Sequence, residues 1–220
     1  MKFDFIRKEL LNHINLCVKS KYRTFDKAHN VSHFNYVTNN CVNYAKSLNN
    51  MGKNVSLEVA YVVGAYHDLG LIYGRENHAK NSGIFVMQDD VLKQFFDDET
   101  IKLIAEAAED HSSHLSYEPR NIYGKIVADA DRNNTLYLTF SRPVKYGLKH
   151  ESHLNRLGQI ERTYNFVNQK FGKNGYVKYW LSIPETKMYQ QSIWNMLDNK
   201  EMCFGYIAGI LDEVTKDKLK

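Results

Sequence analysis

Histidine and aspartate residues at separate points of the chain are of the types that bind a divalent metal ion. His67 and Asp68 stand side by side, His33 precedes them, and Asp131 follows much later. Neutral imidazole and ionised carboxylate are good donors for divalent Mn, Fe, Co, Ni and Zn, and no thiolate accompanies them here. These residues therefore form a candidate site for a divalent transition metal.

Helix geometry limits how these residues can meet. Adjacent helical residues point about 100° apart, so His67 and Asp68 can share an ion only in a groove beside their helix. The apolar run Val59–Tyr66 before them predicts a buried helix with Ser56 as its N-cap. Two polar side chains at the end of such a helix would be costly to bury without a partner, which favours a functional role.

Apolar residues recur at helical spacing along most of the chain, and convincing strand alternation is absent. We expect helices over Phe3–Cys17, from near Ser32 to Leu48, from Ser56 to near Gly70, from His78 to Met87 with Asn77 as its cap, from a cap at Asp98, over Ile122–Leu138, and on both sides of a turn at Phe171–Gly175. We therefore predict an all-α protein. It would be one helical domain, residues 1–164, with a C-terminal helical extension, residues 165–220, packed on it.

Composition restricts the class of protein. The 220 residues are 43% hydrophobic and 25% charged, which is typical of a globular protein. The three cysteines form no Cys-x-x-Cys pair, and Val59–Tyr66 is far shorter than the roughly 20 residues of a membrane span, so we expect a soluble cytoplasmic protein with no membrane contact. A net charge of +4 suits an anionic small molecule, whereas a nucleic-acid binder would show a clustered basic stripe.

The order and context of the candidate ligands resemble the HD superfamily of metal-dependent phosphohydrolases. That pattern is a His, then His-Asp, then a late Asp that often follows Ala. The chain has His33, then His67-Asp68, then Asp131 in an Ala-Asp-Arg context. The resemblance implies a helical HD-type bundle that hydrolyses a phosphate ester or anhydride with a bound metal. It also implies Asp131 as the ligand rather than Asp129, which would face nearly the opposite way on a helix.

The entry to the pattern is similar to that of uncharacterised bacterial HD-domain hydrolases. There a His commonly precedes the ligand His by four positions, as His29 precedes His33. Tyr36 is a departure, because many of those relatives have Arg at that position.

His78 and His111 raise the question of one ion or two. HD subfamilies with two metals, or with a di-iron centre, follow the order His, His-Asp, His, His, Asp, which this chain reproduces with Asp68 as the bridging carboxylate. His111 continues the apolar stripe of Ile104–Ala108 and should point inward. In the alternative, His78 sits at a helix start and His111 contacts substrate phosphate beside one ion. His114 competes with His111 for this role.

The chemistry we predict is hydrolysis of a nucleotide or a related phosphorylated small molecule. The ion would polarise the phosphoryl group and activate a water, and Asp68 or His111 would handle the proton. The candidates for substrate binding are Arg132, His114, Lys80, Arg142 and His29. Glycine-rich phosphate loops of the Walker or Rossmann type are absent.

Two other functions fit the same sequence. A di-iron oxygenase would use the same six residues on a substrate without phosphate. A non-catalytic sensor or binding module would retain the site for structure, although intact ligand residues count against it. The aromatic helices after Tyr164 fit either a cap over the site or the face of a homodimer.

Overall fold

The computed structural model describes residues 4–113, 115, 117–132 and 135–217, which form α-helices and shorter helical turns without a β-strand. The prediction of an all-α protein is confirmed. The chain separates into two compact units, each described here by itself. The first unit comprises the chain up to Arg132 together with Tyr179–Ile183, and the second comprises the rest. These units differ from the predicted domains, 1–164 and 165–220, which stay a prediction.

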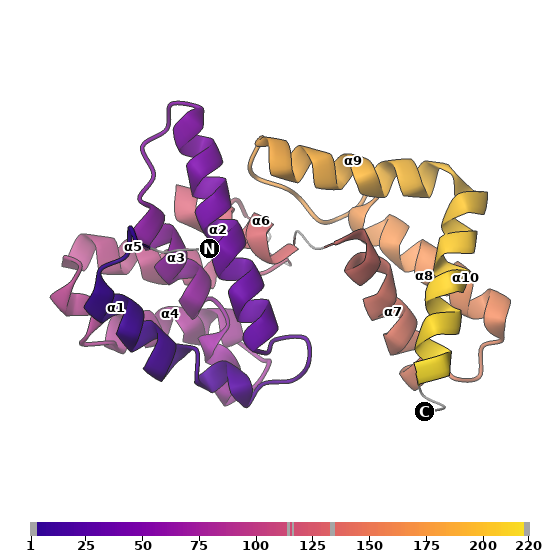
Figure 1. The fold of residues 1–220 in the computed structure, drawn as a ribbon, viewed down its shortest axis with the longest axis horizontal. Coiled ribbons are helices and arrows are strands. Elements are labelled where there is room, and N and C mark those ends of the chain that lie inside the picture. Colours follow the sequence, from indigo (N-terminus) through magenta and orange to yellow (C-terminus); the bar gives the residue numbers. More distant parts are fainter. Residues whose placement is uncertain (1–3, 114, 116, 133–134, 218–220) are drawn as a thin grey trace. The chain divides into compact units, whose positions relative to one another are not determined.

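The first unit is built around one enclosed helix (Figure 1). Its α-helices are α1 (Lys8–His13), α2 (Val31–Asn50), α3 (Leu57–Tyr66), α4 (His78–Gln88), α5 (Asp98–Glu109) and α6 (Ile122–Arg132), and its shorter helical turns are η1 (Ile14–Val18), η2 (Lys21–Arg23), η3 (Leu69–Tyr73) and η4 (Leu92–Gln94). Every residue of α3 from Val59 to Tyr66 is buried, and α2, α5 and α6 pack around it. A helix that is apolar on all sides requires such enclosure.

The start of the chain differs from the expected helix over Phe3–Cys17. Phe3 lies outside the described residues, α1 ends at His13, and the π-helical turn η1 follows. A π turn takes more residues than an α turn, so the inward position moves from Cys17 to Val18. Cys17 is therefore exposed and Val18 is buried. The prediction that Cys17 ends the buried face of this first helix was therefore wrong.

Two other predicted boundaries were wrong. The single helix expected over Ile122–Leu138 is divided, because α6 ends at Arg132 and a new helix starts at Leu136 with Thr135 as its cap. The cap of α5 is Asp97 rather than Asp98, since Asp97 has extended backbone and its carboxylate accepts a hydrogen bond from Thr100 N at 2.8 Å.

The start of α3 agrees with the prediction, but its predicted end near Gly70 was wrong, because α3 ends at Tyr66 and Asp68 has left the helical backbone. Ser56 caps α3 by accepting a hydrogen bond from Val59 N at 3.3 Å, as predicted. The cap predicted at Asn77 was wrong: Asn77 precedes α4 with a left-handed backbone (φ 57°) and makes no side-chain cap.

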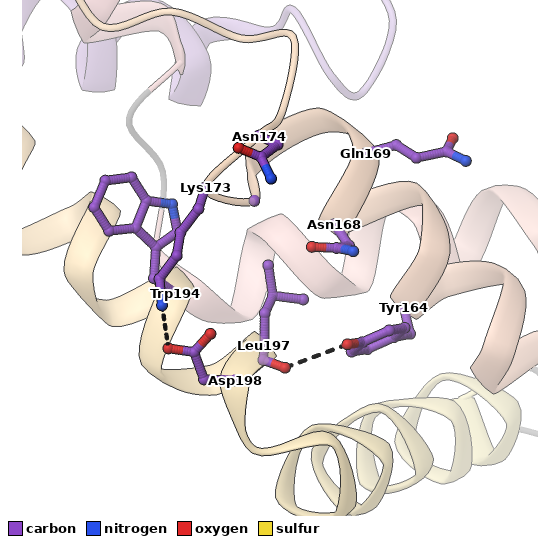
Figure 2. Close-up of a pocket in the computed structure, with 9 residues that line it drawn as sticks. Tyr164, Asn168, Gln169, Lys173, Asn174, Trp194, Leu197 and Asp198 are labelled. Atoms are coloured by element: carbon purple, nitrogen blue, oxygen red, sulfur yellow. Dashed lines mark hydrogen bonds and ion pairs between the residues drawn. The ribbon is translucent and has the colours of Figure 1, made fainter.

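The second unit contains α7 (Leu136–His150), α8 (Arg156–Phe171), α9 (Pro184–Asp198) and α10 (Lys200–Asp217). A pocket of about 320 Å³ lies between the end of α8 and α9 (Figure 2). Within its lining, Lys173 pairs with Asp198 at 2.7 Å, and the Tyr164 hydroxyl donates to Leu197 O at 3.3 Å. No candidate metal ligand lines this pocket.

A distant segment completes the first unit. Leu181 and Ile183, from Tyr179–Ile183, are buried in its hydrophobic core. The Asp129 carboxylate of α6 accepts hydrogen bonds from Trp180 N at 3.0 Å and Leu181 N at 2.8 Å. This contact fixes the backbone of the segment against the helix that ends with Asp131 and Arg132. Among the described residues, no helix has both the length and the apolar character that a membrane crossing requires.

Gly70 lets the turn after the His-Asp pair touch α4. A Cβ at this position would lie 1.9 Å from His78 O and 2.7 Å from Ser82 N, so backbone would have to move. We predict that Gly70→Ala destabilises the protein by on the order of 3 kcal/mol, measured by urea unfolding. Gly205→Ala is the control. Its Cβ meets nothing within 4 Å on α10, and it should leave stability unchanged or raise it by up to about 1 kcal/mol. Equal stability of the two variants would contradict this packing.

Candidate metal centre

The His-Asp pair lies where α3 ends. His67 retains helical backbone (φ −53°, ψ −37°), whereas Asp68 departs from it (φ −107°, ψ 5°). The Tyr22 hydroxyl holds this exit by donating to Ala65 O at 2.9 Å and accepting from Asp68 N at 3.3 Å. The side chains of His67 and Asp68 can therefore approach each other because the helix ends between them. The sequence had suggested only a groove beside the helix.

The first donor group combines His33, His67 and Asp68, with Asp131 beside it. The Nε2 atoms of His33 and His67 lie 3.3 and 3.1 Å from Asp68 Oδ2. His33 Nε2 is also 3.2 Å from Asp131 Oδ1. The donor atoms of the first three residues all lie within 4.8 Å of one another, close enough to surround a single ion.

The second donor group uses the other oxygen of the same carboxylate. Asp68 Oδ1 lies 3.5 Å from His111 Nε2 and 3.8 Å from His78 Nε2. These three residues also keep their donor atoms within 4.8 Å of one another. Asp68 therefore stands between two donor groups, with one oxygen toward each.

Backbone carbonyls orient three of the imidazoles. The Nδ1 atoms of His67, His78 and His111 lie 2.8, 2.9 and 2.7 Å from carbonyl oxygens three residues earlier in the chain. A carbonyl can only accept, so Nδ1 carries the proton in each neutral ring and Nε2 presents its lone pair to the cluster. For His67 and His111 the acceptors, Gly64 O and Ala108 O, belong to the last turns of α3 and α5, where helices leave carbonyls unpaired.

The charges of the cluster depend on one another. Burial alone would raise the pKa of Asp68, but the imidazoles of His67, His111 and His33 hold it well below its usual range. Burial alone would lower the pKa of His33, but the carboxylates of Asp131 and Asp68 raise it to about 9. The pKa of His111 is raised, against the effect of burial, by Asp68 and Asp131, whereas burial and His111 lower that of His78.

These residues fit a divalent cation. The Nε2 atoms of His33 and His67 are 3.2 Å apart, and those of His78 and His111 are also 3.2 Å apart. Lone pairs facing each other at that distance repel unless a cation or a proton lies between them. Asp68 Oδ2 is buried and has no hydrogen-bond donor among the described residues. A set of nitrogen and carboxylate donors of this kind suits Mn, Fe, Co, Ni or Zn.

The cluster is open on one side. The side chains of His33, His67, Asp68 and His111 are at most 6% exposed, whereas those of His78 and Asp131 are 29% and 27% exposed. A substrate would therefore approach past His78 and Asp131.

The two aspartates of α6 point to different partners. Asp131 lies beside His33, whereas Asp129 is fully buried against the backbone of Trp180 and Leu181. Burial raises the pKa of Asp129 to about 7, against the opposing hydrogen bonds from that backbone. Arg132 is buried with Asp129: its Nη2 donates to Ser112 O at 2.7 Å, and its Nη1 is 3.9 Å from Asp129 Oδ1.

The predicted substrate-binding residues lie on several elements of the chain. His29 packs edge-on against the ring of His33, with centroids 5.8 Å apart. Lys80 is exposed on α4, just after His78. Arg142 is exposed on α7 in the second unit. Arg132 donates a hydrogen bond to the backbone of Ser112. His114 lies outside the described residues. The role of each of these residues in substrate binding stays a prediction.

Sequence reasoning missed residues that hold the ligands in place. Tyr22 has no signal beyond being apolar and aromatic, because its hydroxyl contacts depend on tertiary packing. Asp26 accepts a hydrogen bond from His29 Nδ1 at 2.9 Å and pairs with Arg75. The one available hint was Asp26 three residues before His29.

We predict that substitution of Asp131 affects metal binding and that substitution of Asp129 affects stability. Asp131→Asn should unfold near the temperature of the unchanged protein but lower metal affinity at least about tenfold, because a donor is lost. Asp129→Ala should destabilise by about 2–4 kcal/mol, because buried backbone N–H groups lose their acceptor, while its folded fraction keeps its metal. Thermal melts and metal analysis test both variants, and reversed results would contradict the assignment.

We also predict that metal binding releases a proton. With its pKa at about 9, His33 is protonated in the metal-free protein at pH 7, and a metal ion must displace that proton. Affinity should therefore rise about tenfold per pH unit up to about pH 9. Calorimetry at pH 7 in buffers of different ionisation enthalpy would count the released proton, with His153→Gln, exposed in the second unit, as control. Affinity independent of pH between 6 and 8 would contradict it.

Comparison with known proteins agrees with this geometry. Residues 31–135 match the family model of the HD domain, a span that includes all six clustered ligands. No curated protein and no solved structure matched the chain. The chain therefore contains an HD domain over residues 31–135.

Proposed function

We propose that this protein is a metal-dependent phosphohydrolase that acts on a nucleotide or a related phosphorylated small molecule. HD domains are typically metal-dependent phosphohydrolases. The observation that favours catalysis here is the buried Asp68, which offers one carboxylate oxygen to each of two imidazole groups. A site retained only for structure would not need an open side bordered by His78 and Asp131.

The residues of the cluster would divide the work between holding the ion and receiving substrate. His33, His67, Asp68 and Asp131 would bind one ion, and Asp68, His78 and His111 a second. When bound, a divalent ion supplies Lewis acidity toward the phosphoryl group and toward water. Asp68 stays ionised, because its low pKa keeps a proton from competing for its oxygens. His78 and Asp131 would border the entering phosphoryl group.

The proton acceptor depends on the number of ions. With two ions, both oxygens of Asp68 would be engaged by metal and the Nε2 lone pair of His111 would be taken, so neither group would readily accept a proton. With one ion at the first donor group, His111 Nε2 remains available to take the proton or to contact the phosphoryl oxygen. Metal analysis of protein purified without chelator distinguishes the two cases: a ratio near one would make His78 and His111 substrate contacts.

The central prediction is metal-dependent release of phosphate or nucleoside from a panel of nucleotides and phosphorylated sugars. Asp68→Asn should lower kcat/KM at least about 100-fold, because the shared carboxylate loses its charge. Asp90→Asn is the matched control, since Asp90 is 88% exposed and pairs only with Lys93. If the protein loaded in turn with Mn, Fe, Co, Ni and Zn left the whole panel intact, the proposal would be wrong.

An iron-dependent oxygenase is the second candidate, because a carboxylate between two imidazole groups also suits a pair of iron ions. Iron at two ions per chain, together with oxygen consumption on a substrate without phosphate, would favour it over hydrolysis. Phosphate release with redox-inert Zn would exclude it as the main activity.

A further inference from the structure

Three residues outside the donor groups are linked at the open side of the metal centre. Asp26 Oδ1 accepts from His29 Nδ1 at 2.9 Å, and Asp26 Oδ2 pairs with the guanidinium of Arg75. His29 in turn contacts the ring of His33. One carboxylate therefore places an imidazole and a guanidinium next to each other, with the imidazole nearer to the ligands.

The backbone of Arg75 also forms a hydrogen bond with His78, the most exposed of the predicted metal ligands. Its carbonyl oxygen accepts the Nδ1 hydrogen of His78 at 2.9 Å, and His78 is 29% exposed. Two left-handed residues on either side of Arg75, Gly74 (φ 100°) and Asn77 (φ 57°), shape the turn that permits this. The side chain of Arg75 thus starts next to the most exposed residue of the cluster.

The Arg75 guanidinium is able to bind an anion where it stands. Its side chain is 70% exposed and that of Asp26 is 48% exposed, and ion pairs so exposed contribute little stability. The contact with Asp26 engages Nη2 and leaves Nε and Nη1 as donors. A planar guanidinium that keeps several donors suits the oxygens of a phosphate group.

We propose that Arg75, held by Asp26 beside His29, binds a second anionic group of the substrate, beyond the phosphoryl group at the metal centre. Asp26 and His29 lie between Arg75 and His33, so the guanidinium stands outside the residues that would hold the ion. The substrate class that follows is a molecule with more than one phosphate, such as a nucleoside diphosphate or triphosphate. This inference rests on the proposed function, since it concerns the substrate of the same site.

Binding of two simple anions tests the proposal without any turnover. Calorimetry would compare inorganic phosphate with inorganic pyrophosphate on the Mn-loaded protein. Arg75→Gln should weaken pyrophosphate about tenfold and phosphate by no more than about twofold, because only the longer anion reaches the guanidinium. The metal content should stay unchanged, since the carbonyl that orients His78 remains. Lys102→Gln, which removes one exposed charge from α5, is the control for general electrostatic attraction.

The possible results separate this inference from the proposed function. Pyrophosphate affinity that is unchanged in Arg75→Gln, or equal to that of Lys102→Gln, would overturn the role of Arg75. Equal weakening of both anions would also overturn it, because Arg75 would then serve the group at the metal centre itself. Failure to hydrolyse any phosphate compound would instead refute the proposed function, and the affinity ratio would still report on Arg75.

Discussion

The metal centre depends on one buried carboxylate, that of Asp68, whose pKa the neighbouring imidazoles hold well below its usual range. Its side chain is 4% exposed, and imidazoles of His33, His67, His78 and His111 lie on both sides of it. Removing a charge from water costs several kcal/mol or more unless partners compensate. The raised pKa of His33 follows from the carboxylate of Asp131 together with that of Asp68.

The helices supply the orientation that the charges need. α3 and α5 both end at the cluster. The Nδ1 atoms of His67 and His111 form hydrogen bonds with carbonyl oxygens in the last turns of these two helices. The C-terminal end of a helix is its negative pole, which favours a cation nearby. His33 comes from the first turn of α2 and His78 from the first residue of α4, so helix ends surround the cluster. Helix ends are rigid and can fix donors without strained loops.

Three aspartates show how position decides the use of one side chain. Asp68 and Asp131 face imidazoles, and Asp129 binds the backbone of a segment from beyond residue 178. Asp129 and Asp131 are two residues apart on one helix, so they face different surroundings. The HD family match covers both, but only the tertiary contacts distinguish a metal donor from a structural acceptor.

Sequence patterns were sufficient to predict the helical class, the buried helix α3 and the histidines and aspartates that the structure brings together. Apolar spacing reports which side of a helix is buried, and a His-Asp pair after an apolar helix is hard to explain without a partner. The sequence could not determine the break between α6 and α7 or the π turn at η1, because single residues at helix ends decide these. Tyr22, the Asp26–Arg75 pair and the Trp180 segment were also beyond its reach. Their contacts join residues far apart in the chain, and only folding brings them together.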